Sequence, residues 1–372
     1  MKSLEQVIID RIKSKGPVTF ETFMDMSLYY PGLGYYTSPD ATIGRKGDFY
    51  TSSHLHSLFG TMIGKQLEEM WEVMDKPSVF HVVEVGAGAG YLSQDIHTYL
   101  QKSEIYHALQ YIIVEQNPAL VESQKRLLSD FRTKMRWMKT VRDLPQIRGC
   151  IFSNELLDAF PVHLVEMHDE LKEVYVGYSK DNFIDIIQNV SSLKLINYFN
   201  VYLTDIPRGF RTEINLRIKD WLREVDNFLS EGFILTIDYG YTAREYYDEE
   251  RSSGTLLCYH RHQYNDNPYI NIGRQDITAH VNFSSLKKWG DEIGLTTIGY
   301  CPQGTFLVAL GIDELIQELH RKSPDYTSEI SKIKGLLLPQ GMGESHKVMI
   351  QYRGDNLPVM KGFSLRNQLG SL

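Results

Sequence analysis

The stretch Phe80-His81-Val82-Val83-Glu84-Val85-Gly86-Ala87-Gly88-Ala89-Gly90 decides the fold. Its first six residues are mostly apolar and β-branched, as in a short buried strand, and a glycine-rich turn follows. The apolar residues behind the turn recur at helical spacing: Tyr91, Leu92, Ile96, Tyr99 and Leu100. The pattern therefore predicts a strand, a turn and a helix, with free N–H groups at the start of the helix facing a bound ligand.

The spacing of the glycines separates two classes of cofactor site. A dinucleotide fingerprint, G-x-G-x-x-G, places its third glycine where this chain has Tyr91. The observed pattern, Glu84-x-Gly86-x-Gly88-x-Gly90, resembles motif I of class I S-adenosyl-L-methionine (SAM) dependent methyltransferases. A glycine-rich turn without a ligand remains an alternative, since short motifs produce false positives.

Length and composition bound the class of protein. The chain has 372 residues, of which 42% are hydrophobic and 23% charged, and these values are ordinary for a globular protein. The length suffices for two domains or for one large α/β domain with insertions. The net charge of −8 argues against an extended nucleic-acid surface, because phosphate binding needs concentrated basic residues. No apolar run approaches the roughly 20 residues that span a bilayer.

Cysteine and histidine usage gives no sign of a metal site. Cys150, Cys258 and Cys301 lie far apart and form no C-x-x-C pair, so we expect free thiols and a reducing compartment. None of the 12 histidines has the spacing of a zinc motif such as H-E-x-x-H. Residues 1–16 contain acidic side chains and no apolar core, so we expect neither a signal peptide nor a transit peptide.

Strand and helix patterns alternate from about residue 79. Such alternation predicts a parallel sheet with helices on both faces. The expected strands are 79–85, 111–115, 135–138, 150–153, 233–238, 296–300 and 346–352. The expected helices are 91–101, 118–131, 212–230 and a serine-capped helix at 284–293. Periodicity alone leaves 305–311 open between strand and helix.

Two regions depart from this alternation. Residues 1–75 have the pattern of helices and loops, and we expect a helical cap with lid loops there. After Pro161 the rhythm breaks, so we expect 162–211 to form an inserted lobe, either a substrate clamp or a dimer surface. The remaining segments, 76–161 and 212–372, then form the cofactor-binding α/β domain.

Acidic and aromatic residues stand at the ends of the first three expected strands, where ligands bind in an open parallel sheet. Glu84 closes the first strand. Glu115 closes the second and, with Gln116 beside it, is placed to accept hydrogen bonds from ribose hydroxyls. The alternative for Glu115 is a polar residue at a strand boundary. Trp137 and Met138 end the third strand and predict either a flat wall for adenine or plain core.

The segment after the fourth strand carries Asn154, Glu155 and Asp158. In this architecture it faces the methyl donor, so these side chains are candidates for the reaction site. Carboxylates there can align a nitrogen nucleophile and help to remove its proton. The alternative is that Asn154 and Asp158 only cap the next helix. Asp238, at the end of the fifth strand, adds another acid to the same rim.

A compact polar patch precedes the helix expected at 284–293. It contains Asp276, Thr278 and His280. A lone histidine is more often a satisfied structural residue, but three such side chains together make a functional role an equal alternative. We include Asp276 and Thr278 as candidates on the acceptor side and His280 as a candidate catalytic residue.

Six segments of the chain, taken together, resemble the motifs of one known family. They are Gly47-Asp48-Phe49-Tyr50-Thr51, the glycine turn, Asn154-Glu155-Leu156-Leu157-Asp158-Ala159-Phe160-Pro161-Val162, Thr212-Glu213-Ile214-Asn215, Ile237-Asp238-Tyr239-Gly240 and Gln275-Asp276-Ile277-Thr278-Ala279-His280-Val281-Asn282-Phe283. In this order they resemble the MidA-like family of SAM-dependent methyltransferases. Mitochondrial members of that family are protein-arginine methyltransferases that assist assembly of respiratory complex I. The likeness runs from about residue 5 to residue 352.

The resemblance implies a class I methyltransferase fold of the α/β, Rossmann-like type. This fold has six parallel strands and one antiparallel strand, here with an N-terminal helical cap and an inserted lobe. By that template the reversed strand is 346–352, and 305–311 is a helix. The family's turn more often reads G-P-G-x-G, so the small, apolar Ala87 and Ala89 are departures.

The resemblance also implies roles for single residues. Glu84, Gly86, Ala87, Gly88 and Gly90 match the amino-acid end of the cofactor, and Glu115 matches its ribose. Asn154, Glu155 and Asp158 match the reaction rim. A lid over the site is implied for Gly47, Asp48, Phe49 and Tyr50, as lids exclude water.

We therefore expect an enzyme that transfers a methyl group from SAM to nitrogen, most plausibly of a protein arginine, and leaves S-adenosyl-L-homocysteine. The acidic rim of Glu155, Asp158, Asp238 and Asp276 suits a cationic substrate. We expect a cytoplasmic, bacterial-type protein with a protein partner and a homodimer as one option. The alternatives are a nicotinamide- or flavin-dependent oxidoreductase and a non-catalytic SAM-binding assembly factor.

Overall fold

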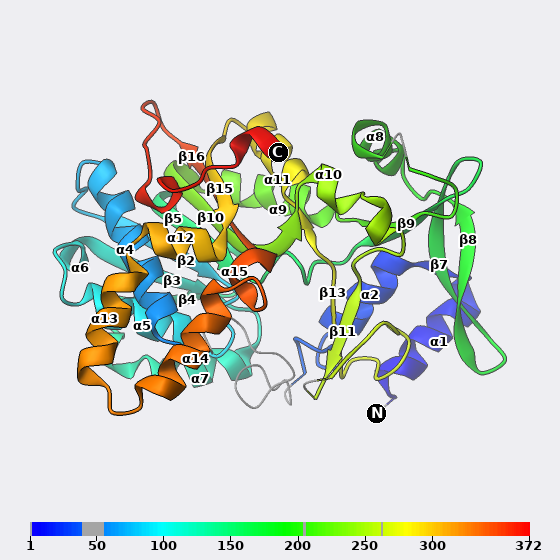
Figure 1. The fold of residues 1–372 in the computed structure, drawn as a ribbon. Helices are drawn as coiled ribbons and strands as arrows, with labels where there is room; N and C mark the ends of the chain where they lie inside the picture. The colour runs from blue at the N-terminus through cyan, green and yellow to red at the C-terminus, as the bar shows by residue number, and fades with distance from the viewer. Residues whose placement is uncertain (1, 39–55, 204–205, 262) are drawn as a thin grey trace.

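Two large sheets organise the molecule. The structure is a computed structural model that describes residues 2–38, 56–203, 206–261 and 263–372. Figure 1 shows the larger sheet with most of the helices on one side of the molecule, and the smaller sheet with the N-terminal helices on the other. The expected lid residues Gly47, Asp48, Phe49 and Tyr50 lie outside the described residues.

The larger sheet has the order β15-β16-β10-β5-β2-β3-β4, and a short strand, β14 (Val281–Asn282), extends it beside the end of β10. Only β16 in this order runs antiparallel to its neighbours. This topology confirms the predicted methyltransferase sheet and its reversed last strand. The strands are β2 (Phe80–Val85), β3 (Leu109–Val114), β4 (Met135–Met138), β5 (Ile147–Asn154), β10 (Leu229–Tyr241), β15 (Thr296–Pro302) and β16 (His346–Arg353).

Apolar residues on both faces of this sheet explain its burial. Neighbouring strand residues point to opposite faces, so Val82 packs into one hydrophobic core and Val83 into the other. The first face is covered by α4 (Leu58–Val73), α5 (Tyr91–Leu100), α12 (Gln303–Ala309) and α14 (Tyr326–Leu337). The second face is covered by α9 (Arg217–Asp226) and α11 (Phe283–Glu292).

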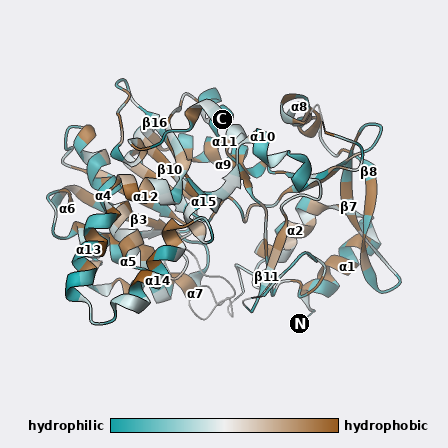
Figure 2. Ribbon diagram, viewed as in Figure 1, coloured by the Kyte–Doolittle hydropathy of each residue, from teal (hydrophilic) through white to brown (hydrophobic). Residues whose placement is uncertain are grey.

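The remaining helices are short or lie at the edges. Figure 2 shows hydrophobic and hydrophilic residues side by side on α13, as expected of a helix at the surface. No helix of the described residues is long and apolar enough to cross a membrane. Apart from the two at the N-terminus, the remaining α-helices of the described residues are α6 (Ile105–Ala108), α7 (Pro118–Leu127), α8 (Leu193–Tyr202), α10 (Ala243–Tyr246), α13 (Ile312–Lys322) and α15 (Met342–Ser345).

The smaller sheet has the order β1-β7-β6-β9, and β8 pairs with the free side of β7. Helices α1 (Leu4–Lys15) and α2 (Phe20–Tyr29) share a hydrophobic core with it, and Figure 1 shows them beside β7. Its strands are β1 (Val18–Thr19), β6 (His163–Met167), β7 (Leu171–Ser179), β8 (Asn182–Asn189) and β9 (Arg211–Ile214). A third sheet joins β11 (Leu257–His260), β12 (Gln263–Asn265) and β13 (Asp276–Thr278).

Several sequence-based boundaries need correction. The helix expected at 212–230 begins only at Arg217, because residues 211–214 pair with β6 as strand β9. Asn282, not a serine, caps α11 by accepting hydrogen bonds from Ser284 N and Ser285 N. The ambiguous segment 305–311 is mostly helical, in α12. Helix α4 packs on the larger sheet although it lies within the expected N-terminal cap; the division of the chain into domains remains a prediction.

Candidate functional site

A cavity of about 570 Å³ opens at the carboxyl ends of β2, β3 and β5. This is the edge at which parallel α/β sheets bind ligands, and the volume is typical of a cofactor pocket. Ten predicted site residues line it: Glu84, Gly86, Ala87, Gly88, Glu115, Gln116, Asn154, Glu155, Asp158 and Asp276.

The glycine turn forms the floor of the cavity. Gly86, Gly88 and Gly90 have φ angles of 75°, 53° and 87°, a region that L side chains rarely adopt. A Cβ on Gly86 would lie 3.0 Å from Leu156 Cδ1. Bare backbone is therefore required both by the turn's conformation and by the segment packed against it.

Behind the turn, Gln124 connects two elements to it. Gln124 Nε2 donates to Gly88 O over 2.8 Å, and Gln124 Oε1 accepts from Trp137 Nε1 over 3.0 Å. Gln124 also packs where a Cβ on Gly90 would be, at 3.2 Å from its Cγ. Trp137, Met138 and Gly90 are absent from the cavity lining, so Trp137 supports the turn from behind.

Glu84 is held rigidly under the turn. It is buried and accepts hydrogen bonds from Ser93 Oγ and, over 2.5 Å, from Tyr111 Oη. Burial raises the pKa of Glu84 to about 7, although both hydrogen bonds oppose the rise. A bound cation or N–H donor near Glu84 would favour its charged form.

Glu115 connects the cofactor side of the cavity to the N-terminal segment. Its Oε1 accepts from Asn117 N over 2.8 Å, and burial raises its pKa to about 6. Asn117 Nδ2 in turn donates to Tyr36 O over 2.9 Å. One asparagine therefore holds both a predicted ribose ligand and the backbone of residue 36.

Asp238 organises the loop that follows β5. Its Oδ2 accepts from the backbone N–H groups of Leu156, Leu157 and Asp158 at 3.2, 2.9 and 3.4 Å, while Oδ1 accepts from Tyr239 N. Burial raises its pKa to about 8, with a further rise from Glu155. Because Asp238 does not line the cavity, it positions the reaction rim from behind.

The reaction rim itself carries Asn154, Glu155 and Asp158. Glu155 has a φ of 51°, so the chain turns sharply at this residue, and Asn154 Nδ2 donates to Glu155 Oε1 over 3.3 Å. Asp158 accepts from Tyr239 Oη, and burial followed by the charge of Asp238 raises the pKa of Asp158 well above its usual value. Among the described residues, Asp158 Oδ1 has no hydrogen-bond partner.

Three tyrosines from the N-terminal segment form a wall that sequence reasoning missed. Tyr29, Tyr35 and Tyr36 line the cavity, and the rings of Tyr29 and Tyr36 stack at 5.4 Å between centroids. Tyr36 Oη donates to Asp276 Oδ1 over 2.8 Å, and Tyr29 Oη donates to Ala159 O over 3.0 Å. The tyrosine-rich stretch before residue 37 was visible in the sequence, but nothing local tied it to the strand ends.

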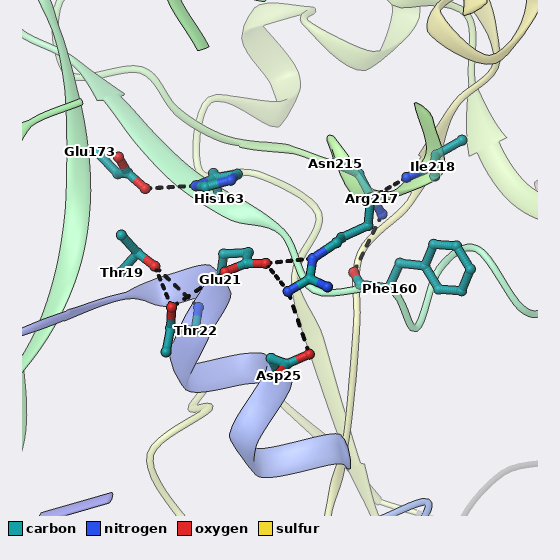
Figure 3. Close-up of polar contacts among 10 residues, drawn as sticks. All are labelled: Thr19, Glu21, Thr22, Asp25, Phe160, His163, Glu173, Asn215, Arg217 and Ile218. Carbon is teal, nitrogen blue, oxygen red and sulfur yellow. Dashed lines mark hydrogen bonds and ion pairs between the residues drawn. The ribbon is translucent and has the colours of Figure 1, made fainter. Parts of the chain in front are cut away.

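Arg217 fastens the same segment to α9. Figure 3 shows its guanidinium between Glu21 and Asp25 of α2, with Nε 2.6 Å from Glu21 Oε1 and Nη2 3.6 Å from Asp25 Oδ1. Asn215, at the start of α9, donates from Nδ2 to Leu157 O and Phe160 O. The following residues also line the cavity and were not predicted from the sequence: Asp25, Lys139, Thr140, Val141, Arg217, Asp220, Trp221 and Glu224.

His280 and Thr278 lie behind the rim, outside the cavity lining. The His280 ring packs edge-on against Tyr239, at 5.2 Å between centroids. Burial, followed by Arg251 and His346, lowers the pKa of His280 to about 4. No group of three or more His, Cys, Asp or Glu residues in the described part of the chain is placed to hold a metal ion.

Comparison with known proteins identifies the family. The sequence model of a family described as "Putative S-adenosyl-L-methionine-dependent methyltransferase" matches residues 62–301, which is more than half of the chain. The chain belongs to this family. It is an α/β SAM-dependent methyltransferase of the MidA-like group, as the six segments indicated, and the oxidoreductase alternative is not supported.

Relatives and solved structures agree over nearly the whole chain. The mitochondrial protein arginine methyltransferase NDUFAF7 homolog of Drosophila melanogaster is 27% identical, covering 97% of this chain and 89% of its own. Human mitochondrial protein arginine methyltransferase NDUFAF7 is 25% identical, with 90% and 80% covered. A Burkholderia thailandensis structure bound to S-adenosyl-homocysteine is 28% identical and covers 99% of this chain and 96% of its own, at a TM-score of 0.91.

The cofactor is SAM, and the cavity fits it. Three glycines with positive φ let the backbone approach a ligand closely. Carboxylates end β2 and β3 at spacings suited to polar cofactor groups. Asp158, whose Oδ1 is buried without a partner among the described residues, also lines this cavity.

Proposed function

We propose that this enzyme methylates a nitrogen of an arginine side chain in a protein partner. Asp158 carries the proposal: it is buried, lines the cavity and leaves Oδ1 without a partner among the described residues. An unsatisfied buried carboxylate oxygen is costly. A guanidinium N–H would satisfy it with a charge-assisted hydrogen bond and would favour the ionised carboxylate.

The charge and shape of the cavity support a planar cation. Among the residues that the structure describes, only Lys139 and Arg217 supply cationic side chains to its lining, and Arg217 is engaged by Glu21. A guanidinium stacks well on aromatic faces such as those of the tyrosine wall. The relatives described above are named protein arginine methyltransferases, which supports this proposal. The carboxylates of the lining away from the glycine turn are Asp25, Glu155, Asp158, Asp220, Glu224 and Asp276.

We assign roles to the side chains on this basis. The glycine turn with Glu84 and Ala87 holds the amino-acid end of SAM, and Glu115 with Gln116 holds its ribose. When bound, SAM supplies an electrophilic methyl carbon on a cationic sulfur. Asp158 and Glu155 orient the acceptor nitrogen in line with that carbon, and Glu155 accepts its proton.

Several sequence predictions stay part of this proposal. They are a protein partner, no nucleic-acid ligand, a homodimer and a cytoplasmic location. The relatives named above are mitochondrial proteins, which makes the location worth testing by fractionation.

The test uses SAM with a tritiated methyl group. Incubation with a cell protein fraction, followed by acid hydrolysis, should release labelled methylarginine. A peptide with one arginine should be labelled, whereas the same peptide with lysine or citrulline should not. Label on another amino acid would overturn the arginine proposal, and no label on any protein would favour the non-catalytic alternative.

Site variants sharpen this test. Asp158→Asn should lower transfer by at least about 100-fold, the scale of a lost transition-state interaction, and leave the Kd of S-adenosyl-homocysteine within about threefold. Glu155→Gln should likewise lower the rate of transfer by at least about 100-fold and leave the Kd of S-adenosyl-homocysteine within about threefold. Glu170→Gln is the matched control, since Glu170 is an exposed carboxylate in the smaller sheet region. Wild-type activity in Asp158→Asn would overturn the assigned role.

A further inference from the structure

The reversed strand β16 brings a histidine to the reaction edge. All other long strands of the larger sheet reach this edge with their carboxyl ends, whereas β16 enters the sheet there. Its first residue, His346, pairs in register with Tyr239 near the end of β10. The topology therefore places a residue 191 positions after Glu155 beside that carboxylate.

The two ring nitrogens of His346 face different environments. Nε2 lies 3.6 Å from Glu155 Oε1, and both side chains are almost fully buried. Nδ1 lies 3.1 Å from Ser345 Oγ. Ser345 is exposed, and its hydroxyl donates to Gly341 O over 3.4 Å. In the tautomer protonated at Nδ1, this hydroxyl accepts from His346 and Nε2 turns its lone pair to Glu155.

We propose that His346 is a positioning residue that conducts the proton released by methyl transfer from Glu155 to the surface at Ser345. The inference rests on the proposed transfer to nitrogen. It extends that function because His346 does not line the cavity and acts only through Glu155.

Transfer to nitrogen leaves a proton on Glu155 that must be removed before the next turnover. The lone pair of the acceptor nitrogen forms the N–C bond, the C–S electron pair stays on sulfur, and the nitrogen gives up one proton to Glu155. Nε2 of His346 takes that proton from Glu155, and Nδ1 releases its own proton to Ser345 and water. The ring, now protonated at Nε2, turns and exchanges its proton with water to regain the starting tautomer, and Glu155 is again charged.

The other charged groups around His346 are already engaged. Tyr239 packs against its ring, at 5.3 Å between centroids, and His280 lies against the same tyrosine with a pKa lowered to about 4. His280 therefore stays neutral and does not compete for the proton. Lys347 Nζ donates to Glu344 O over 2.6 Å, Arg251 packs on Tyr241, and Asp238 accepts the backbone N–H groups of the rim loop.

The first measurement needs no acceptor. Nitrogen-15 NMR of the histidine rings, with S-adenosyl-homocysteine present, should show His346 protonated at Nδ1. Glu155→Gln should change the nitrogen-15 chemical shift of His346 Nε2, because the carboxylate 3.6 Å from that atom becomes an amide. The matched control is Glu166→Gln, which should change the nitrogen-15 shift of His168, 2.9 Å away from Glu166, and leave that of His346 unchanged. An unaltered His346 spectrum in Glu155→Gln would overturn the proposal.

The second measurement is the pH profile of transfer to the arginine peptide. His346→Gln and His346→Phe should each slow transfer at pH 7 by about 10- to 100-fold. This is less than the roughly 100- to 10,000-fold of a lost general acid or base, because Glu155 still accepts the first proton. Their rates should climb with pH while the Kd of S-adenosyl-homocysteine stays within twofold. His168→Gln serves as the matched control and should keep the wild-type profile. Equal losses at every pH would show a merely structural role and reject the relay.

Failure of the two proposals can be told apart. If the wild-type enzyme labels no arginine, the proposed function fails. The nitrogen-15 spectra of the wild type and of Glu155→Gln still decide whether Glu155 interacts with the His346 ring. If arginine is labelled and the His346 variants keep the wild-type pH profile, only the proton exit fails.

Discussion

The floor and the tyrosine wall of the cavity are held together in different ways. The floor is the glycine turn, fixed by Glu84 beneath it and by Gln124 behind it. The wall, Tyr29, Tyr35 and Tyr36, is fixed by a few side-chain contacts to distant segments. Changes in the floor should therefore remove cofactor binding, whereas changes in the wall should affect the acceptor and leave the cofactor bound.

The largest effect is expected from Gly86→Val. A β-branched residue at φ 75° is strained, and its Cβ would press on Leu156 Cδ1. The Kd of S-adenosyl-homocysteine, measured by calorimetry, should rise by about 100-fold or more. Gly294→Val is the matched control: Gly294 has a φ of 82° with open space around it, far from the cavity. Gly294→Val should lower the free energy of unfolding and leave the Kd of S-adenosyl-homocysteine within twofold. Tight binding in Gly86→Val would contradict a rigid floor.

Acid should weaken the support beneath the floor through His97 on α5. This ring is buried, stacks on Phe131 at 4.9 Å, and has a pKa lowered to about 3 by burial and then by Lys134. The unfolded chain binds this proton near pH 6.5 and the folded chain only near 3, so stability falls as the pH drops below 6.5. The loss is on the order of 2 kcal/mol between pH 6.5 and 5.

Urea unfolding at several pH values tests this expectation. His97→Phe keeps the stacking and should remove the share of the acid sensitivity that His97 contributes, while the share of His280, whose pKa is lowered to about 4, remains. His107→Gln, a change at an exposed histidine nearby, should keep it. If the acid slope of His97→Phe equals that of the wild type, another group is responsible.

A smaller effect is expected in the wall from Tyr36→Phe. The change deletes the hydroxyl that donates to the Asp276 carboxyl and costs about 1.5 kcal/mol, where the ranges for hydrogen bonds to neutral and to charged groups meet. The KM for the arginine peptide should rise a few-fold while the Kd of the cofactor product stays within twofold. Tyr99→Phe removes a similar bond, to Glu68 at 2.7 Å, away from the cavity and should change neither constant. A large loss of cofactor affinity in Tyr36→Phe would break the distinction between floor and wall.

The smallest effect is expected from Arg217→Gln. Its guanidinium is about half exposed, at 47% of the side chain, so the pair with Glu21 contributes less than about 1 kcal/mol. Limited proteolysis within α2 should nevertheless quicken, because α2 loses its contact with α9. Arg148→Gln removes an equally exposed pair with Glu231 on the far side and should leave this cleavage unchanged.

Sequence reasoning succeeded where structure and chemistry are local. The strand, glycine turn and helix at 80–100, the acids at strand ends and the rim after β5 depend on neighbours along the chain. The reversed strand came from the family resemblance, since periodicity carries no strand direction. Asp238 was expected at a strand end, whereas β10 continues to Tyr241. Its role behind the rim depends on the backbone of 156–158, which no sequence pattern reports.

The residues that were missed depend on long-range contacts. Tyr36 meets Asp276 because the segment after α2 lies beside β13, and Arg217 meets Glu21 because α2 lies beside the start of α9. Trp137 has a flat aromatic ring that would suit adenine, but its indole N–H donates to Gln124 behind the glycine turn. His346 became visible only once β16 was known to start at the reaction edge.

The hydrogen bond between Tyr36 and Asp276 also bears on the order in which parts of the chain fold. It closes a loop of 240 residues, whereas the bond between Tyr111 and Glu84 closes one of 27. Loop closure becomes entropically more costly with length, and such contacts form late. The cofactor pocket can therefore assemble before the acceptor side exists, so that a chain emerging during synthesis gains its donor site early and its selectivity last.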